Sequence, residues 1–355
     1  MQLYMPTKIY SEKDCVVAHG AQLQALGTKA MIVTGKTSAV KTGALADVLQ
    51  ALGQTPYVVF DQIEENPSVE TVLQAQKVAV QEHVDFFIGI GGGSAMDAAK
   101  AISLLAKNFP KSEEILYDPA VLPYYPVACI PTTCGTGSEA TPYAILTIHK
   151  KQTKKSISHR IYPVLSLMDD KYLRTMPRHI LVNTCVDALA HLLESYLNTN
   201  SNDLNRVYSR EGLLMWRSFR DHLLEDAVTD ADYRNMLHAS MVAGMAITHT
   251  GTSLPHGLSY AVTYTLGIPH GRAVGIFLGG YVDSYGDPAD ATEAVKLLGF
   301  ATTGEFRDYL RKLLGEADIP QSLLSTAAKM ILSDPGKMKN CPYPMTEEKL
   351  IGMLN

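Results

Sequence analysis

The sequence predicts an α/β domain built on a parallel sheet, followed by an all-helical domain. Up to about residue 175, short β-branched or aromatic runs alternate with segments of helical period, which is the pattern of strands joined by crossover helices. A glycine-rich turn joins the third expected strand to its helix. After Pro177 the strand pattern disappears. We therefore expect domains at 1–176 and 177–355.

The expected elements follow from the same periodicities. Buried strands are expected at 31–34, 57–60, 85–90 and 127–130, with helices at 37–52, 68–83 and 94–107. A hairpin-like pair, 144–148 and 156–158, and a strand at 162–168 complete the first domain. In the second domain, helices are expected at 179–198, 203–224, 231–249, 254–264, 271–284, 289–299, 303–315 and 320–332, with a loop at 333–345.

Composition excludes several classes of function. A net charge of −5 gives no basic footprint for nucleic acid or for an anionic membrane. No apolar run approaches the roughly 20 residues of a membrane span, and the first residues lack a signal-peptide pattern. Five cysteines without a C-x-x-C pair need no disulfide framework. We expect a cytoplasmic protein.

The segment between Cys185 and Gly271 predicts a divalent-metal site. Asp187 and His191 are four residues apart, so a helix would present both on one face. Such pairs also arise by chance on helices. However, two Pro-His-Gly tripeptides, at 255–257 and 269–271, add two further imidazoles at expected helix starts.

His256 and His270 require a break between them. Along one helix, fourteen residues would separate them by about 21 Å. Gly267 is suited to end a helix and Pro269 to begin the next one. One carboxylate with three imidazoles suits iron(II) or zinc better than calcium or magnesium.

A phosphate-bearing ligand is the natural partner of the turn Gly89–Ser94. Its glycines allow close backbone approach, and the helix that follows offers free N–H groups. A tight β-to-α turn without a ligand is the alternative.

The next loop, Pro131–Glu139, is rich in hydroxyls that could donate to ribose, phosphate or nicotinamide, although such turns are often only structural. One lysine of the basic stretch 150–155 could also reach a cofactor. Because the first half carries the phosphate turn and the second half the metal ligands, we expect the active site in the cleft between the domains.

Taken together, these motifs resemble the iron-containing (group III) alcohol dehydrogenases along essentially the whole chain. The motifs that carry the resemblance are Glu65–Pro67, Gly91–Asp97, Pro131–Glu139, Val186–His191 and the pair His256 and His270. The resemblance implies a Rossmann-like domain and a helical domain, the plan shared with dehydroquinate synthase. It also implies NAD(P)-dependent interconversion of an alcohol and an aldehyde or ketone, and a homodimer. Asp187, His191, His256 and His270 match the family's metal ligands.

Two departures from the family pattern bear on cofactor and mechanism. Many members have a histidine near the nicotinamide where this chain has Tyr260, so Tyr260 is a candidate in proton transfer. Members selective for NAD often have an Asp where this chain has Gly35, followed by Lys36 and Ser38. Without that carboxylate a 2′-phosphate is not repelled, so NADP(H) is favoured over NAD(H). The residues expected to contact the dinucleotide are Gly35, Lys36, Ser38, Asn66, Gly91, Gly92, Gly93, Ser94, Asp97, Thr132, Thr133, Thr136, Ser138 and Lys155.

The predicted function is that of a metal-dependent alcohol dehydrogenase or aldehyde reductase acting on a small primary alcohol or aldehyde. The metal would be Fe²⁺, with Zn²⁺ possible as in related glycerol dehydrogenases. One alternative is a lyase of the dehydroquinate synthase type, which the scarcity of Lys and Arg between 180 and 205 disfavours. The other is a non-catalytic nucleotide or metal sensor on the same fold.

Overall fold

The computed structural model describes residues 3–354, and its chain divides into two compact units. Tyr4–Thr133 and Gly137–Met176 form an α/β unit. Among the described residues, 177–354 form a helical unit that also includes Leu3 and Cys134–Thr136. Cys134–Thr136 are three residues of the hydroxyl-rich loop 131–139. They belong to the helical unit, although the rest of that loop belongs to the α/β unit.

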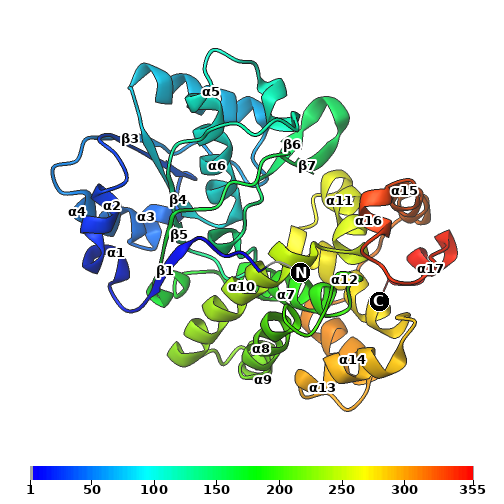
Figure 1. The fold of residues 1–355 in the computed structure, drawn as a ribbon. Coiled ribbons are helices and arrows are strands. Elements are labelled where there is room, and N and C mark those ends of the chain that lie inside the picture. Colours follow the sequence, from blue (N-terminus) through cyan, green and yellow to red (C-terminus); the bar gives the residue numbers. More distant parts are fainter. Residues whose placement is uncertain (1–2, 355) are drawn as a thin grey trace. The chain divides into compact units, whose positions relative to one another are not determined.

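The α/β unit contains a six-stranded, fully parallel sheet, which confirms the predicted Rossmann-like domain (Figure 1). The strand order is β1-β8-β5-β4-β2-β3. The strands are β1 (Lys8–Ser11), β2 (Ala30–Thr34), β3 (Tyr57–Phe60), β4 (Phe86–Gly91), β5 (Val127–Pro131) and β8 (Leu165–Met168). From β2 the chain first adds β3 on one side and then β4 on the other. The sheet therefore has a topological switch point between the ends of β2 and β4.

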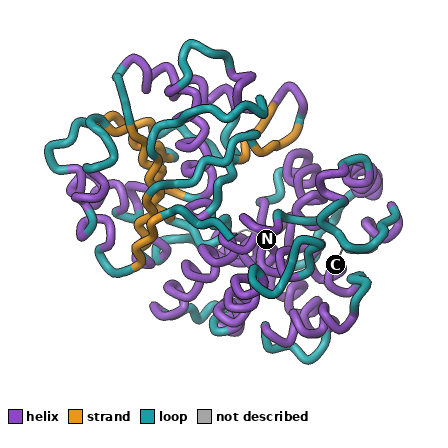
Figure 2. Tube along the Cα trace, in the orientation of Figure 1, coloured by secondary structure: helices purple, strands orange, loops and turns teal. Residues whose placement is uncertain are grey.

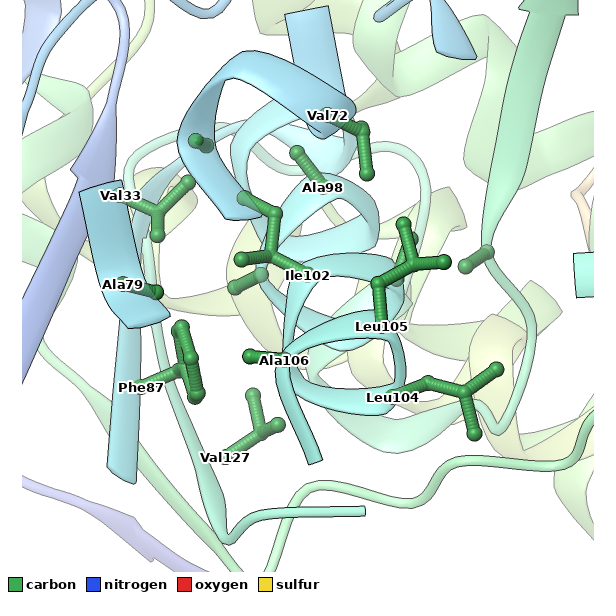
Figure 3. Packing of buried hydrophobic residues seen from close by; sticks show 14 of the residues in the cluster. Val33, Val72, Ala79, Phe87, Ala98, Ile102, Leu104, Leu105, Ala106 and Val127 are labelled. Atoms are coloured by element: carbon green, nitrogen blue, oxygen red, sulfur yellow. The ribbon is translucent and has the colours of Figure 1, made fainter. Parts of the chain in front are cut away.

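Helices cover both faces of this sheet because its inner strands, β2, β4, β5 and β8, are buried on both sides. Met31 and Val33 of β2 face a core shared with α5 (Val69–Gln81) and α6 (Gly93–Lys107). Figure 3 shows Val33 with residues of these helices. Ala30 and Ile32 face the opposite core, which includes residues of α1 (Cys15–Ala18), α2 (Gly20–Gln24), α3 (Ser38–Lys41) and α4 (Ala44–Leu52). This three-layer arrangement, with helices on each face of the sheet, is expected for parallel strands that are buried on both faces.

Several boundaries differ from the prediction. The segment 37–52 is two helices, because Gly43 adopts a left-handed conformation with φ 82° and caps the second one. The strand expected at 162–168 begins only at Leu165, after Pro163, which has no N–H to donate. The hairpin consists of β6 (Ile145–Ile148) and β7 (Thr153–Ser156), so β7 begins three residues earlier than expected.

The helical unit contains no strand among its described residues, as predicted (Figure 2). Its helices are α7 (Arg178–Tyr196), α8 (Arg206–Arg217), α9 (Arg220–Glu225), α10 (Asp230–Thr250), α11 (Leu254–Leu266), α12 (His270–Asp283), α13 (Pro288–Leu297), α14 (Thr303–Leu314), α15 (Gln321–Leu332), α16 (Pro335–Met338) and α17 (Glu347–Ile351). The segment 203–224 is broken after Arg217, and α16 lies in what was expected to be a loop. At its centre, α7 packs against α8, α10 and α12 and is buried along almost its whole length. Within residues 3–354, no helix is both long and apolar enough to cross a bilayer.

Candidate metal centre and dinucleotide site

The metal-site prediction begins on α7, where Asp187 and His191 are both buried. Their spacing of four residues places them one helical turn apart. Because α7 is packed on several sides, both side chains point into the interior of the helical unit. A buried carboxylate beside a buried imidazole needs compensation from other charges or from a cation.

The other two histidines come from a helix pair that is broken as predicted. α11 ends at Gly267, which has the left-handed φ of 66° that favours glycine, and α12 begins at His270 after Pro269. His256 lies in the first turn of α11. The break therefore allows one residue from the start of each helix to approach the same point on α7.

Three of the four predicted ligands come together closely. Ligand atoms of Asp187, His256 and His270 all lie within 4.8 Å of one another. Oδ1 of Asp187 is 3.3 Å from Nε2 of His256 and 3.7 Å from Nε2 of His270. His191 lies outside this set of three, but its ring stacks on that of His256 with centroids 4.4 Å apart.

Two of the imidazoles are oriented through their Nδ1 atoms. Glu194, fully buried on α7, accepts a hydrogen bond from Nδ1 of His256 and another, at 3.0 Å, from the backbone N–H of the same residue. Nδ1 of His191 donates to the Gly135 carbonyl at 3.2 Å. Both contacts leave Nε2 as the nitrogen able to bind a cation, which is the usual arrangement for a metal-ligating histidine.

The charges of the cluster favour a cation. Burial would raise the pKa of Asp187, but the imidazoles of His191, His270 and His256 outweigh it and hold that pKa far below its usual range. Burial lowers the pKa of His191 to about 4, so this imidazole is neutral near pH 7. Burial acts in the same direction on His256, but Glu194 and Asp187 outweigh it and raise its pKa to about 10. In the absence of metal, a proton on His256 supplies the positive charge that a divalent ion would otherwise provide.

The donor set fits iron(II) or zinc. Oδ1 of Asp187 and Nε2 of His256 are buried and make no hydrogen bond of normal geometry, although they lie 3.3 Å apart. A shared cation would satisfy both atoms. Tyr260 on α11 lies beside this cluster, with its ring 5.9 Å from that of His270. The region also contains Glu194, which the sequence analysis missed.

Substituting Glu194 by Gln is expected to weaken metal binding by about 10- to 100-fold, the typical cost of losing an outer-shell partner. The neutral amide lacks the negative charge with which the Glu194 carboxylate accepts the hydrogen bond from Nδ1 of His256. The volume of the side chain is nearly unchanged. Titration of metal-stripped protein with Zn²⁺ would measure the effect. Glu293→Gln, at an exposed glutamate that pairs with Arg210, is the matched control and should bind zinc like the wild type. Equal affinity of Glu194→Gln and wild type would show that Glu194 does not tune this site.

Several of the predicted dinucleotide residues lie at the carboxyl ends of the parallel strands in the α/β unit. Gly35 to Ser38 follow β2, and Gly91 to Ser94 run from the last residue of β4 into α6, on the two sides of the switch point. A Cβ at Gly91, whose φ is 149°, would lie 4.0 Å from Oγ of Ser38, so the two turns adjoin. A Cβ at Gly92 would lie 3.1 Å from the Thr133 side chain. Open α/β sheets bind their ligands at such a switch point, beyond the carboxyl ends of the strands.

Asn66 connects this turn to the hairpin. Its backbone N–H donates to Oγ of Ser94 at 3.1 Å, and its side-chain oxygen accepts from Nζ of Lys154 at 2.5 Å. Lys155, the lysine selected from sequence, points elsewhere and lies over the ring of Tyr117. The structure thus places Lys154, and not Lys155, against Asn66, the residue that contacts Ser94 of the glycine-rich turn.

The buried side chains of Lys100 and Asp97 bind the loop after β5 through several hydrogen bonds. Nζ of Lys100, which is fully buried on α6, donates to Oγ of Ser138 at 2.7 Å and to the carbonyls of Ser138, Thr141 and Tyr143. The carboxylate of Asp97 accepts from Oγ of Ser138 at 2.6 Å and from the Ile145 N–H at 2.8 Å. Thr132 lies on the same loop, whereas Thr136 belongs to the helical unit. Lys100, missed in the sequence analysis, therefore shapes this side of the predicted site.

Glu139 should make stability depend on pH. Burial raises its pKa to about 7 from an ordinary 4.5, and its Oε1 makes no hydrogen bond. Since the folded state binds this proton more tightly than the unfolded state, stability should fall as the pH rises from about 4.5 to 7 and then level off, by at most about 3 kcal/mol. Glu139→Gln should therefore gain stability relative to wild type across that range, as measured by urea unfolding at several pH values. A constant difference between the two proteins would show that Glu139 does not titrate there.

The glycine-rich turn and the metal cluster together indicate a class of protein. A glycine-rich turn at the switch point of a parallel sheet, together with a buried carboxylate–imidazole cluster in a helical unit, is typical of enzymes that use a dinucleotide and a divalent metal. Comparison with known proteins then identifies the family. The model of the iron-containing alcohol dehydrogenases matches residues 6–170, and that of the C-terminal domain of the same family matches 181–350. The chain belongs to the iron-containing alcohol dehydrogenase family and is an oxidoreductase of that class.

Individual relatives agree with this assignment. The chain is 30% identical to an NADPH-dependent butanol dehydrogenase of Clostridium saccharobutylicum over 78% of this chain and 72% of that protein. It is 31% identical to a 1,3-propanediol dehydrogenase of Citrobacter freundii over 71% and 66% of the respective chains. The solved structure of an iron-containing alcohol dehydrogenase from Thermotoga maritima matches with a TM-score of 0.92 and 33% identity, covering 99% of this chain and 98% of that one. These matches support the dehydrogenase prediction, and the lyase and sensor alternatives find no support in them.

Proposed function

We propose that this protein reduces a small aldehyde to the primary alcohol, or catalyses the reverse reaction, with a preference for NADP(H). The observation that carries the proposal is the convergence of Asp187, His256 and His270 within 4.8 Å, in a chain that belongs to this family. When bound, the metal would polarise the substrate oxygen and the nicotinamide would exchange the hydride. We assign metal binding to Asp187, His191, His256 and His270.

The protein's own contribution in this proposal is orientation. Glu194 and the Gly135 carbonyl fix the rings of His256 and His191, so the donor atoms need little rearrangement when they bind. Tyr260 is assigned to hydrogen bonding near the reacting oxygen, on the basis of its position beside His270. A phenol can both donate and accept a hydrogen bond, so Tyr260 can orient the reacting oxygen.

For the cofactor, we propose that the turn Gly91–Ser94 cradles the pyrophosphate and that Lys36 and Ser38 receive the 2′-phosphate. Lys36 is exposed at the end of β2 and no carboxylate occupies the position of Gly35, which supports this assignment. Asp97 and Ser138 are proposed to act indirectly, by holding the loop after β5, since each is engaged with protein groups. Lys154 replaces Lys155 as the proposed lysine contact.

Nicotinamide absorbance during reduction of a panel of short aldehydes tests the proposal. Protein purified without oxygen and loaded with Fe²⁺ should consume NADPH faster than NADH. Lys36→Ala should raise KM for NADPH about tenfold or more while leaving KM for NADH nearly unchanged, because a charge-assisted contact is lost. A preference for NADH would overturn the cofactor assignment alone. If neither cofactor is oxidised with any aldehyde by protein shown to hold iron, the proposed reaction is wrong.

We also propose a cytoplasmic homodimer, as the family resemblance implies. Sedimentation analysis of the purified protein tests the dimer: a single species with the mass of one 38.7 kDa chain would contradict it.

A further inference from the structure

Two cysteine thiols meet in the helical unit, next to the metal cluster. The Sγ atoms of Cys134 and Cys185 are 3.7 Å apart, both side chains are buried, and neither is in a disulfide. Cys134 lies in the insertion Cys134–Thr136 and Cys185 on α7. We infer that these two residues form a reversible disulfide when a small peroxide oxidises the protein, and that this bond weakens metal binding by displacing the carbonyl that orients His191.

The backbones of the two segments that carry these cysteines are in close contact. A Cβ built on Gly135 would lie 2.7 Å from the carbonyl oxygen of Thr184 and 2.9 Å from its Cα, so the residues adjacent to the two cysteines are in direct backbone contact. A disulfide requires an S–S distance of about 2.05 Å, so the sulfur atoms must approach by roughly 1.7 Å. Much of that change can come from rotation about the Cα–Cβ bonds, and the remainder must come from the backbone.

The local hydrogen bonds direct the two thiols toward each other. The hydroxyl of Thr184 donates to the Leu181 carbonyl at 3.1 Å, and its oxygen lies 3.6 Å from Sγ of Cys134, where it can accept from that thiol. This leaves the sulfur of Cys134 as the acceptor that faces Cys185. Thr184 is partly exposed, whereas the two thiols are buried, so a peroxide must be small to reach them.

The reaction is balanced with hydrogen peroxide as the oxidant. One sulfur attacks a peroxide oxygen, the O–O bond breaks, and a sulfenic acid and one water form. The second sulfur then attacks the sulfenic sulfur, the S–S bond forms, and the hydroxyl leaves as a second water with the remaining thiol proton. Both sulfurs are oxidised and both peroxide oxygens are reduced to water. A dithiol reductant reverses the bond by exchange.

The effect on the metal cluster follows from which segment can move. α7 is a 19-residue helix packed against α8, α10 and α12, whereas Cys134–Thr136 is a short loop segment. Closure of the disulfide should therefore shift the loop, and with it the Gly135 carbonyl that accepts from Nδ1 of His191 at 3.2 Å. Loss of such an outer-shell partner typically lowers metal affinity by about 10- to 100-fold.

The test uses the full-length protein with zinc in the site, so that peroxide does not react with iron. After treatment with hydrogen peroxide, mass spectrometry should detect the loss of two hydrogen atoms and a cross-linked peptide pair containing Cys134 and Cys185. Dithiothreitol should reverse both changes. Trp216, the single tryptophan of the chain, donates its indole N–H to the Cys185 carbonyl at 2.9 Å, so its fluorescence should change as the bond forms. Zinc affinity should fall by about 10- to 100-fold in the oxidised protein.

Matched variants identify the thiols. Cys185→Ala and Cys134→Ala should each abolish the cross-link, whereas Cys129→Ala, at a buried cysteine on β5, should still form it. Addition of oxygen atoms to either cysteine without a cross-link would overturn the proposal, as would a cross-link that leaves zinc affinity unchanged. Peptide mapping of the oxidised wild type tests the cross-link directly, even if a variant does not fold. These measurements require no turnover, so they are independent of the proposed reaction.

Discussion

Replacing His256 by alanine is expected to empty the metal site and to lower aldehyde reduction by at least about a thousandfold. This imidazole contributes one of three ligand atoms within 4.8 Å, and Glu194 orients it. Polarisation of the substrate oxygen by a metal is worth several kcal/mol, and each 1.36 kcal/mol changes the rate tenfold. The variant also leaves the buried Glu194 without its partner, so some loss of stability should accompany the loss of metal.

Metal content by elemental analysis and turnover by nicotinamide absorbance, measured on the same preparation, check this expectation. The matched control is His249→Ala on α10, where the imidazole contacts the Met245 carbonyl and stacks on Tyr208. That variant should retain metal. If His256→Ala is folded and metal-free yet still turns over at near wild-type rate, the metal has no part in the reaction.

The fold was largely predictable because its strands and helices carry strong periodicities. β2, β4 and β5 are buried on both faces and therefore appear as continuous apolar runs. β1 was missed because it is a partly exposed edge strand, Lys8–Ser11, whose only strand neighbour is β8. With only four residues, Lys-Ile-Tyr-Ser, it is too short to show a clear strand period, although Ile9 and Tyr10 favour strands.

The convergence of Asp187, His256 and His270 was predictable because residue type and spacing together indicate a metal-binding chemistry. Glu194 carries a weaker signal: it lies three residues after His191 and seven after Asp187, hence on the same face of α7. That spacing could have identified it as a candidate, but not its contact with His256, which comes from a distant segment. The Gly135 carbonyl has no signal at all, since a backbone acceptor cannot be recognised from residue identity.

The choice between Lys154 and Lys155 depended on the register of a strand. The sequence analysis placed both lysines in the turn of the hairpin, where the direction of a side chain is not fixed. In the structure both lie on β7, and successive side chains of a strand point to opposite faces. Lys154 therefore reaches Asn66 while Lys155 faces Tyr117. A difference of a few residues in where the strand begins therefore changes which of the two lysines is expected to lie near Asn66.

Gly271→Ala is expected to separate α12 from α7 and to remove His270 from the metal cluster. A Cβ at this position would lie 1.8 Å from the carbonyl oxygen of Asn183, one turn before Asp187, so the backbone of α12 must move. Overpacking of this kind typically costs about 1–3 kcal/mol, and because backbone is involved we expect the upper end. The melting temperature should fall by about 5 °C or more, and zinc affinity should fall with it.

Gly304→Ala is the control, because its Cβ would meet only Oγ1 of Thr302 at 3.7 Å in α14. It should be neutral or slightly stabilising. Unchanged stability and zinc affinity in Gly271→Ala would show that the contact between these two helices does not set the position of His270.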